Sequence, residues 1–172
     1  MPTSTSNSLL SRLIGAWDLQ SYCHHPISDP SDKTYPLGPD ARGIIVYTPD
    51  GYMSAQVVRP GQAPFPDGGG ISPETSGTPA DWEAVGRNFI AYSGRFWIDA
   101  SGAEPCLWHE MSVCNVPGMV GLVQKRLVRM EVENGTTYLS LGVESVELEG
   151  VTRAVKVVWK KMGDNKGTKP PM

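Results

Sequence analysis

The chain lacks a long hydrophobic run. No apolar stretch in its 172 residues approaches the roughly 20 that a membrane-spanning helix needs. The short apolar run at 9–14 is interrupted by Arg12, which excludes the hydrophobic region of a secretory signal peptide. We therefore expect a soluble, cytoplasmic protein that has no membrane as a partner.

Basic charge, cysteine and histidine are scarce as well. Lys and Arg number 15 against 18 Asp and Glu, so the net charge is −3 and no basic field points to nucleic acid. The three cysteines follow no metal-binding or redox spacing, so we expect reduced thiols. Of the three histidines, His24 and His25 are adjacent and would point to opposite faces of a strand. The sequence predicts no metal site and no cofactor.

Alternating apolar and polar residues are abundant, and this pattern predicts strands. After a short helix at 9–14, the first strand places four residues on one face: Trp17, Leu19, Ser21 and Cys23. Pro-Asp-Gly at 49–51 and Asn-Gly at 134–135 are typical of hairpin turns. Seven further strands are predicted at 43–48, 52–58, 91–99, 104–113, 122–133, 136–143 and 153–161.

The order of these elements predicts an all-β fold. Eight antiparallel strands in up-and-down order, with a short N-terminal helix, are typical of a closed β-barrel. Thr78 followed by Pro79 predicts one helix between the third and fourth strands. We expect a disordered N-terminus at 1–8, the barrel over 9–161 and a flexible tail at 162–172.

Strand parity across the predicted turns indicates which side chains face the interior. Around residues 49–51, Tyr47 lies beside Met53, whose row is apolar, so Tyr47 points inward. If Asp99 pairs with Glu104, His109 lies opposite Gly94, and the missing side chain leaves space beside the imidazole. The polar side chains predicted to face inward are Ser21, Tyr47, Tyr92, His109, Gln124 and Arg126.

No row predicted to face inward contains a carboxylate. A guanidinium in an apolar interior without a partner would cost several kcal/mol. Arg126 therefore requires a loop carbonyl or acid, a tyrosine oxygen, water or the oxygen of a ligand.

Five segments carry a resemblance to a known family: GAW at 15–17, GIIVYTPDGYMS at 43–54, AYSGRF at 91–96, WH at 108–109 and VW at 158–159. Over about residues 10–161 the chain resembles the small intracellular lipocalin-like domain family of bacteria and fungi. A helix followed by Gly15-x-Trp17 is similar to the lipocalin signature, in which the indole plugs the closed floor of the barrel. The closing strand departs from the family pattern, because Lys161 stands where Trp-x-Arg usually has the arginine that packs over the tryptophan.

The resemblance implies an up-and-down lipocalin-like barrel with a ligand-sized cavity, and it fixes no reaction. Related barrels in natural-product pathways act as cofactor-free cyclases and isomerases. Our first hypothesis is a cofactor-independent cyclase or isomerase of secondary-metabolite biosynthesis, Diels–Alder reactions included, acting on a hydrophobic intermediate in the lumen. The alternatives are a non-catalytic small-molecule carrier with the same lumen and a fully packed barrel that serves structure or protein interaction. A second copy of the chain is kept as a candidate partner.

The enzyme hypothesis assigns roles to the inward polar residues. His109 would give or take a proton, while Arg126, with Tyr47 or Tyr92, would stabilise an enolate or a polarised carbonyl. In the carrier hypothesis, Arg126 and Gln124 would hold a carboxylate or carbonyl. The residues predicted to contact the ligand are Ser21, Met53, Phe96, Met111, Gln124 and Trp159.

Overall fold

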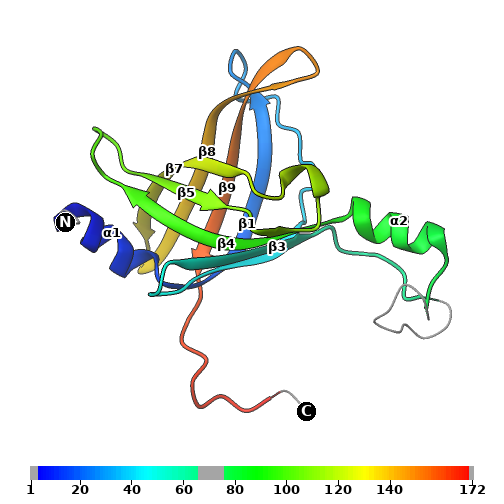
Figure 1. Cartoon of the computed structure of the whole chain (residues 1–172), viewed down its shortest axis with the longest axis horizontal. Helices are drawn as coiled ribbons and strands as arrows, with labels where there is room; N and C mark the ends of the chain where they lie inside the picture. The colour runs from blue at the N-terminus through cyan, green and yellow to red at the C-terminus, as the bar shows by residue number, and fades with distance from the viewer. Residues whose placement is uncertain (1–3, 66–75, 171–172) are drawn as a thin grey trace.

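Eight strands in the described part of the chain close into an antiparallel barrel (Figure 1). The structure is a computed structural model that describes residues 4–65 and 76–170. The barrel strands are β1 (Gly15–Pro26), β2 (Arg42–Tyr47), β3 (Tyr52–Val58), β4 (Phe89–Asp99), β5 (Cys106–Glu110), β7 (Val123–Glu133), β8 (Thr136–Leu148) and β9 (Val151–Lys161). Pairing of β3 with β4 and of β1 with β9 joins the two halves, so the predicted lipocalin-like fold is confirmed.

Three shorter elements accompany the barrel. Helix α1 (Ser4–Leu13) begins inside the segment 1–8, for which the sequence predicted disorder. The predicted strand at 104–113 is broken, because β6 (Val113–Cys114) pairs with β4 beyond the end of β5. A 3₁₀ turn, η1 (Pro117–Met119), follows β6. Residues 162–170, which follow β9, run away from the barrel in Figure 1.

Short turns and α1 gather at one end of the barrel. The turns between β2 and β3 and between β7 and β8 lie at this end, as does the start of β1 after α1. Strands β1, β3 and β5 end at the opposite end, as the up-and-down order requires, and a long connection leaves each of them there. The end with α1 is therefore the floor of the barrel, and the end with the long connections is its mouth.

Trp17 and Lys161 join α1 to the floor. The indole Nε1 of Trp17 donates to the carbonyl oxygen of Leu13 at 2.8 Å, and Trp17 is fully buried. The Nζ of Lys161 lies 4.3 Å from the centre of the Trp17 ring and donates to the carbonyl oxygen of Arg12 at 2.9 Å. Both groups thus satisfy carbonyls that the end of a helix leaves without partners. The lysine makes the cation–ring contact for which the resemblance implies an arginine.

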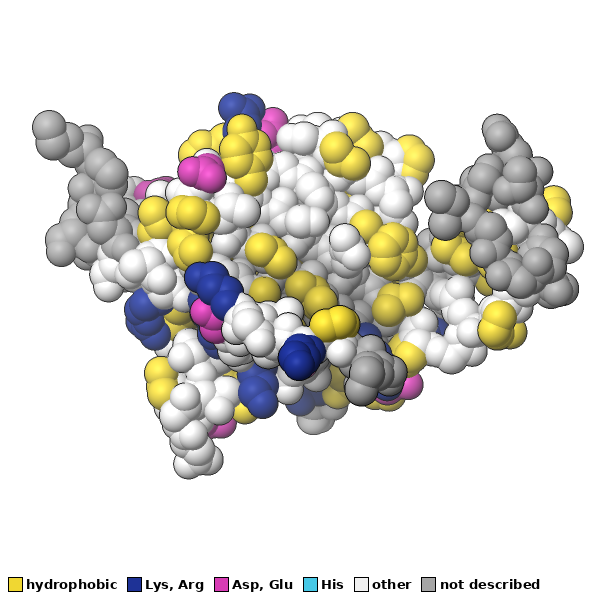
Figure 2. Space-filling view, turned by 90° about the horizontal axis from the view of Figure 1, so that it is seen from below, with side chains coloured by type: hydrophobic (Ala, Val, Ile, Leu, Met, Phe, Trp, Pro, Cys, Tyr) yellow, Lys and Arg dark blue, Asp and Glu magenta, His cyan; other side chains and the backbone are white. Residues whose placement is uncertain are grey.

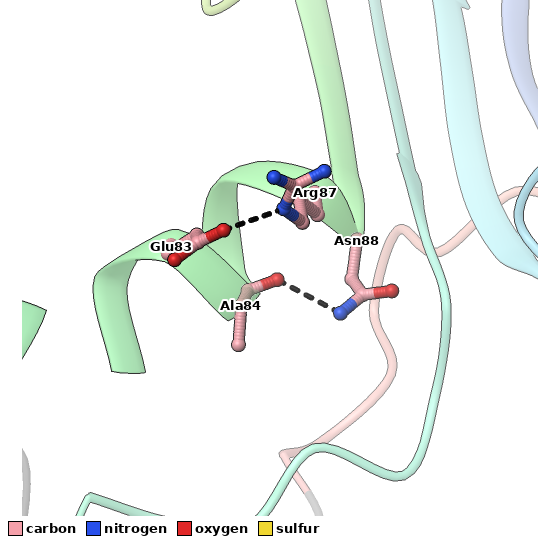
Figure 3. Close-up of polar contacts among 4 residues, drawn as sticks. All are labelled: Glu83, Ala84, Arg87 and Asn88. Carbon is pink, nitrogen blue, oxygen red and sulfur yellow. Dashed lines mark hydrogen bonds and ion pairs between the residues drawn. The ribbon is translucent and has the colours of Figure 1, made fainter. Parts of the chain in front are cut away.

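Helix α2 (Pro79–Arg87) extends away from the mouth of the barrel (Figure 1). As predicted, it begins with Thr78 as N-cap and Pro79 at its first position, and Asp81 completes a capping box. Figure 3 shows its last turn, where Arg87 pairs with Glu83 and the side chain of Asn88 donates to a backbone carbonyl. None of the residues of α2 is buried, so capping and local pairs hold this helix together more than core packing does.

The outer surface is mixed in character. On the face shown in Figure 2, hydrophobic side chains form scattered patches, and Lys or Arg lie beside Asp or Glu. The three cysteines are free. Within the described residues, no helix has the length and apolar character needed to cross a membrane.

Candidate functional site

A bulge in β1 changes which residues face the interior. Leu19 pairs with Trp159, but after a register shift Tyr22 pairs with Val157. One extra residue in a strand moves the following side chains to the other face. The prediction that Ser21 faces inward is therefore wrong, because Ser21 pairs with Val158 on the outer row. Tyr22, which the alternation had placed outside, packs against the core instead.

Tyr47 and His109 meet in the centre of the barrel. The Oη of Tyr47 lies 3.0 Å from the Nε2 of His109, although the two residues are 62 positions apart. Phe96 packs edge-on against Tyr47 with ring centroids 5.1 Å apart. His109 is fully buried and Tyr47 nearly so. The predicted interior positions of these residues agree with the structure.

The neighbour of His109 differs from the predicted one. Asp99 pairs with Cys106 instead of Glu104, so His109 lies opposite Phe96 and not opposite Gly94. The shift is two residues, which leaves His109 on the inner face. Gly94 instead allows the backbone at Glu110 to lie close to β4, since a Cβ at this position would lie 2.1 Å from the carbonyl oxygen of Glu110.

Arg126 is the centre of a second polar group. Its guanidinium donates to the Oε1 of Gln124, which lies opposite His109 on the neighbouring strand. Burial raises the pKa of Tyr92, and the charge of Arg126 together with its hydrogen bond to the Tyr92 hydroxyl partly offsets this rise. Arg126, Gln124 and Tyr92 are half-buried, so they lie together on the accessible part of the inner wall.

Burial keeps the titratable side chains beside Arg126 uncharged. Desolvation, and then the nearby Arg126 charge, lower the pKa of His109 to about 3. Desolvation raises the pKa of Tyr47 well above its ordinary value and also raises that of Tyr22. At neutral pH, His109 and both tyrosines are therefore neutral hydrogen-bonding groups.

The side chains of the inner wall differ in how deeply they are buried. The predicted ligand contacts Met53, Phe96, Met111 and Trp159 are all buried. Other inward-facing side chains keep part of their surface accessible: Tyr22, Ile90, Tyr92, Val128 and Val157. The apolar inner wall thus combines buried side chains with partly accessible ones.

Two interior nitrogens lack a hydrogen-bond partner among the described residues. They are the Nδ1 of His109 and the Nε1 of Trp159, and both are fully enclosed. An indole N–H can only donate, so Trp159 would require an acceptor. Buried polar atoms without partners are costly and uncommon.

The surface also holds an open groove of about 360 Å³ outside the barrel interior. Arg59, Asp81 and Asn88 lie along it, and Phe65 packs edge-on against Trp82 close by. It shares no residue with the polar group around Arg126, which we regard as the candidate site because charge and apolar walls meet there.

The sequence profile of the lipocalin-like domain family matches residues 14–162. The chain belongs to this family. In this lipocalin-like chain, the match covers the whole barrel, from the residue before β1 to the residue after β9.

A fungal relative adds information on binding. The 4'-hydroxy-3'-methoxypropiophenone carrier protein ppsC of Aspergillus oryzae is 30% identical over 114 residues, 64% of this chain and 96% of the relative. Its name describes a carrier of a small aromatic ketone. The lipocalin-like fold and this relative support small-molecule binding.

The buried imidazole predicts a loss of stability in acid. The pKa of His109 is about 3 in the folded barrel and 6.5 ordinarily. Between these two pH values, His109 is therefore protonated in the unfolded chain and neutral in the folded state. Its stabilising contribution is complete above pH 6.5 and falls by about 1.4 kcal/mol per pH unit towards pH 3. Between pH 7 and pH 5, urea unfolding should show wild type losing about 2 kcal/mol more than His109→Gln. Equal losses in the two proteins would contradict a neutral His109.

Proposed function

We propose that this protein binds and carries a hydrophobic small molecule whose polar end has a ketone, enol or phenol oxygen. The observation that carries the proposal is the half-buried group of Arg126, Gln124 and Tyr92 on an otherwise apolar inner wall. An apolar pocket with a few converging polar groups is the usual form of a small-molecule site. The relative named as carrier of an aryl ketone supports this ligand class.

The electrostatics favour a carrier over a catalyst that moves protons. A general base works best when its pKa is near the operating pH. Burial holds the pKa of His109 at about 3, so the imidazole is a weak base. The pKa of Tyr47 is raised well above its ordinary value, so its hydroxyl is a weak acid. The pair is suited to fixing an orientation by hydrogen bonds.

A cyclase or isomerase is the second candidate function, and the same neutral groups support it in one form. A pericyclic closure needs a folded substrate and one polarised carbonyl, without proton transfer. Arg126 and Tyr92 could polarise such a carbonyl while the walls hold the substrate. This candidate requires turnover, which a carrier does not show.

Titration with 4'-hydroxy-3'-methoxypropiophenone tests the proposal. We expect wild type to bind it saturably, with a change in tryptophan fluorescence, and to release it unchanged by mass spectrometry. Arg126→Gln should weaken binding about 10- to 100-fold, because a hydrogen bond to a charged group is lost. Arg129→Gln is the matched control, since Arg129 lies on the same strand, is exposed and faces outward.

Three outcomes separate the candidates. Unchanged ligand with an Arg126-dependent affinity supports a carrier. Conversion of a natural-product intermediate supplied as substrate would favour the second candidate. Absence of saturable binding by wild type would overturn the proposal for this ligand class.

A further inference from the structure

The inner wall holds one charge that the described side chains do not balance. Groups that can ionise lie near Arg126 on four other strands, and burial keeps each of them neutral. They are Tyr22 on β1, Tyr47 on β2, Tyr92 on β4 and His109 on β5. Cys114 on β6 pairs with Tyr92.

Arg126 differs in this respect from the arginines of the outer surface. Among the described side chains, ion pairs join Arg87 to Glu83 and Arg95 to Glu110, and Arg126 takes part in none. Arg95 holds both oxygens of its carboxylate, with Nε 2.8 Å from Oε2 and Nη2 3.3 Å from Oε1. The partners of Arg126 are an amide oxygen and a phenol, which accept hydrogen bonds without cancelling charge.

The number of N–H donors on Arg126 also indicates that the guanidinium can take a further partner. A guanidinium has five N–H groups in a planar fork, which suits two-point contact with anionic oxygen. Gln124 and Tyr92 supply single oxygens, so donors remain for a ligand. In a wall of low polarity, an unbalanced cation favours an anion far more strongly than a cation in water does.

We propose that the site selects an acidic ligand and binds it as its anion, with the ionised oxygen on Arg126. This inference rests on the proposed function and names its ligand class: a phenol made acidic by an acyl group, or the enol of a dicarbonyl compound. Both carry a delocalised negative oxygen on a flat apolar body. The anion restores neutrality to the inner wall, while Gln124 and Tyr92 hold the guanidinium in place.

The proposal predicts a change in the ionisation of a bound probe. An opposite charge within about 4–6 Å lowers an acid's pKa by about 1–3 units, which equals a 10- to 1000-fold preference for the anion. In 4'-hydroxy-3'-methoxypropiophenone, the para acyl group lowers the phenol pKa below the roughly 10 of tyrosine. Ionisation also moves its absorption to longer wavelength, so the bound form can be followed directly.

The experiment is a spectroscopic pH titration of this probe, free and bound to wild type. We expect the bound phenol to ionise at least about 1 pH unit lower than the free phenol. Arg126→Gln should remove the shift and Arg126→Lys should retain most of it, because lysine keeps the charge. Arg129→Gln, on the outer face of the same strand, should behave as wild type. Thermal unfolding of each variant verifies folding. If Arg126→Gln does not fold, the comparison of free probe with probe bound to wild type still tests anion selection.

The methyl ether of the probe, 3',4'-dimethoxypropiophenone, separates the two levels of the proposal. It cannot ionise, so Arg126→Gln should change its affinity less than about 3-fold while the affinity for the phenolate falls at least 10-fold. If the bound phenol titrates as in water, or at higher pH, anion selection is wrong although lumen binding stands. If neither compound binds to wild type, the proposed function itself fails.

Discussion

Trp17→Ala is expected to lower the free energy of unfolding by about 3–5 kcal/mol, the largest effect of any substitution considered for this barrel. Trp17 is fully buried in the core cluster at the floor. Its loss leaves a cavity, removes the hydrogen bond from Nε1 to the carbonyl of Leu13 and takes away the ring beneath the Lys161 amine. The substitution removes core packing, a hydrogen bond and a cation–ring contact at once, because the Trp17 side chain on β1 contacts both α1 and β9.

Trp97→Ala is the matched control for this prediction. Trp97 is 43% exposed on the outer wall, where the guanidinium of Arg95 lies 5.3 Å from its ring. Removing the same side chain there should cost less than about 1 kcal/mol. Urea unfolding followed by circular dichroism measures both variants. A loss for Trp17→Ala no greater than that for Trp97→Ala would refute the role of Trp17 as the plug of the floor.

The parts of the barrel next to short turns could be predicted from the sequence. The turn at 49–51 places Tyr47 opposite Met53, as expected, and the predicted hairpin turn at 134–135 joins β7 and β8, with Met130 opposite Leu139. A hairpin turn of two or three residues fixes its register through its own backbone geometry. The apolar rows then decide which face is buried, without information from the rest of the chain.

The parts that depend on bulges and longer connections could not be predicted. Nothing in the residues around Gln20 distinguishes the bulge from regular alternation, yet it exchanges Ser21 for Tyr22 on the inner wall. The connection after Asp99 is too long to fix a register, so the partner of His109 was misplaced by two residues. Bulges are selected by how strands curve around the barrel, which is a property of distant pairings.

For the candidate site, residue types were predictable and partners were not. An inward arginine without an inward acid indicated that Arg126 requires an acceptor. Side-chain reach decided which acceptor it found, since Gln124 lies two positions away on the same face. Likewise, the absence of the family's arginine at Lys161 suggested a lost contact at the floor. The flexible amine instead reaches both the Trp17 ring and the carbonyls at the end of α1.

Gly94→Ala is expected to destabilise the barrel by about 3 kcal/mol, at the upper end of the usual cost of overpacking. The added Cβ would lie 2.1 Å from the carbonyl oxygen of Glu110 and 2.9 Å from the Oγ of Ser112. The first of these atoms is backbone, so a rotamer change cannot relieve the clash. Thermal unfolding measures the loss. Gly118→Ala is the control, because no atom lies within 4 Å of its added Cβ, and it should change stability by less than about 0.5 kcal/mol.

Gly94→Ala also tests whether the backbone at the end of β5, where the strand breaks before β6, helps to position the polar group around Arg126. Glu110 directly follows His109, and Gly94 is two residues from Tyr92, so displacing the Glu110 backbone moves both walls of the polar group. We expect folded Gly94→Ala to bind 4'-hydroxy-3'-methoxypropiophenone at least about 10-fold more weakly than wild type, the effect of losing one well-placed hydrogen bond. Unchanged affinity with reduced stability would show that Gly94 serves only the packing of β4 against β5. A loss of both stability and affinity would show that Gly94 also positions the site. By allowing the backbone of Glu110 to lie close to β4, the glycine would then set the distance between Tyr92 and the strand that holds His109.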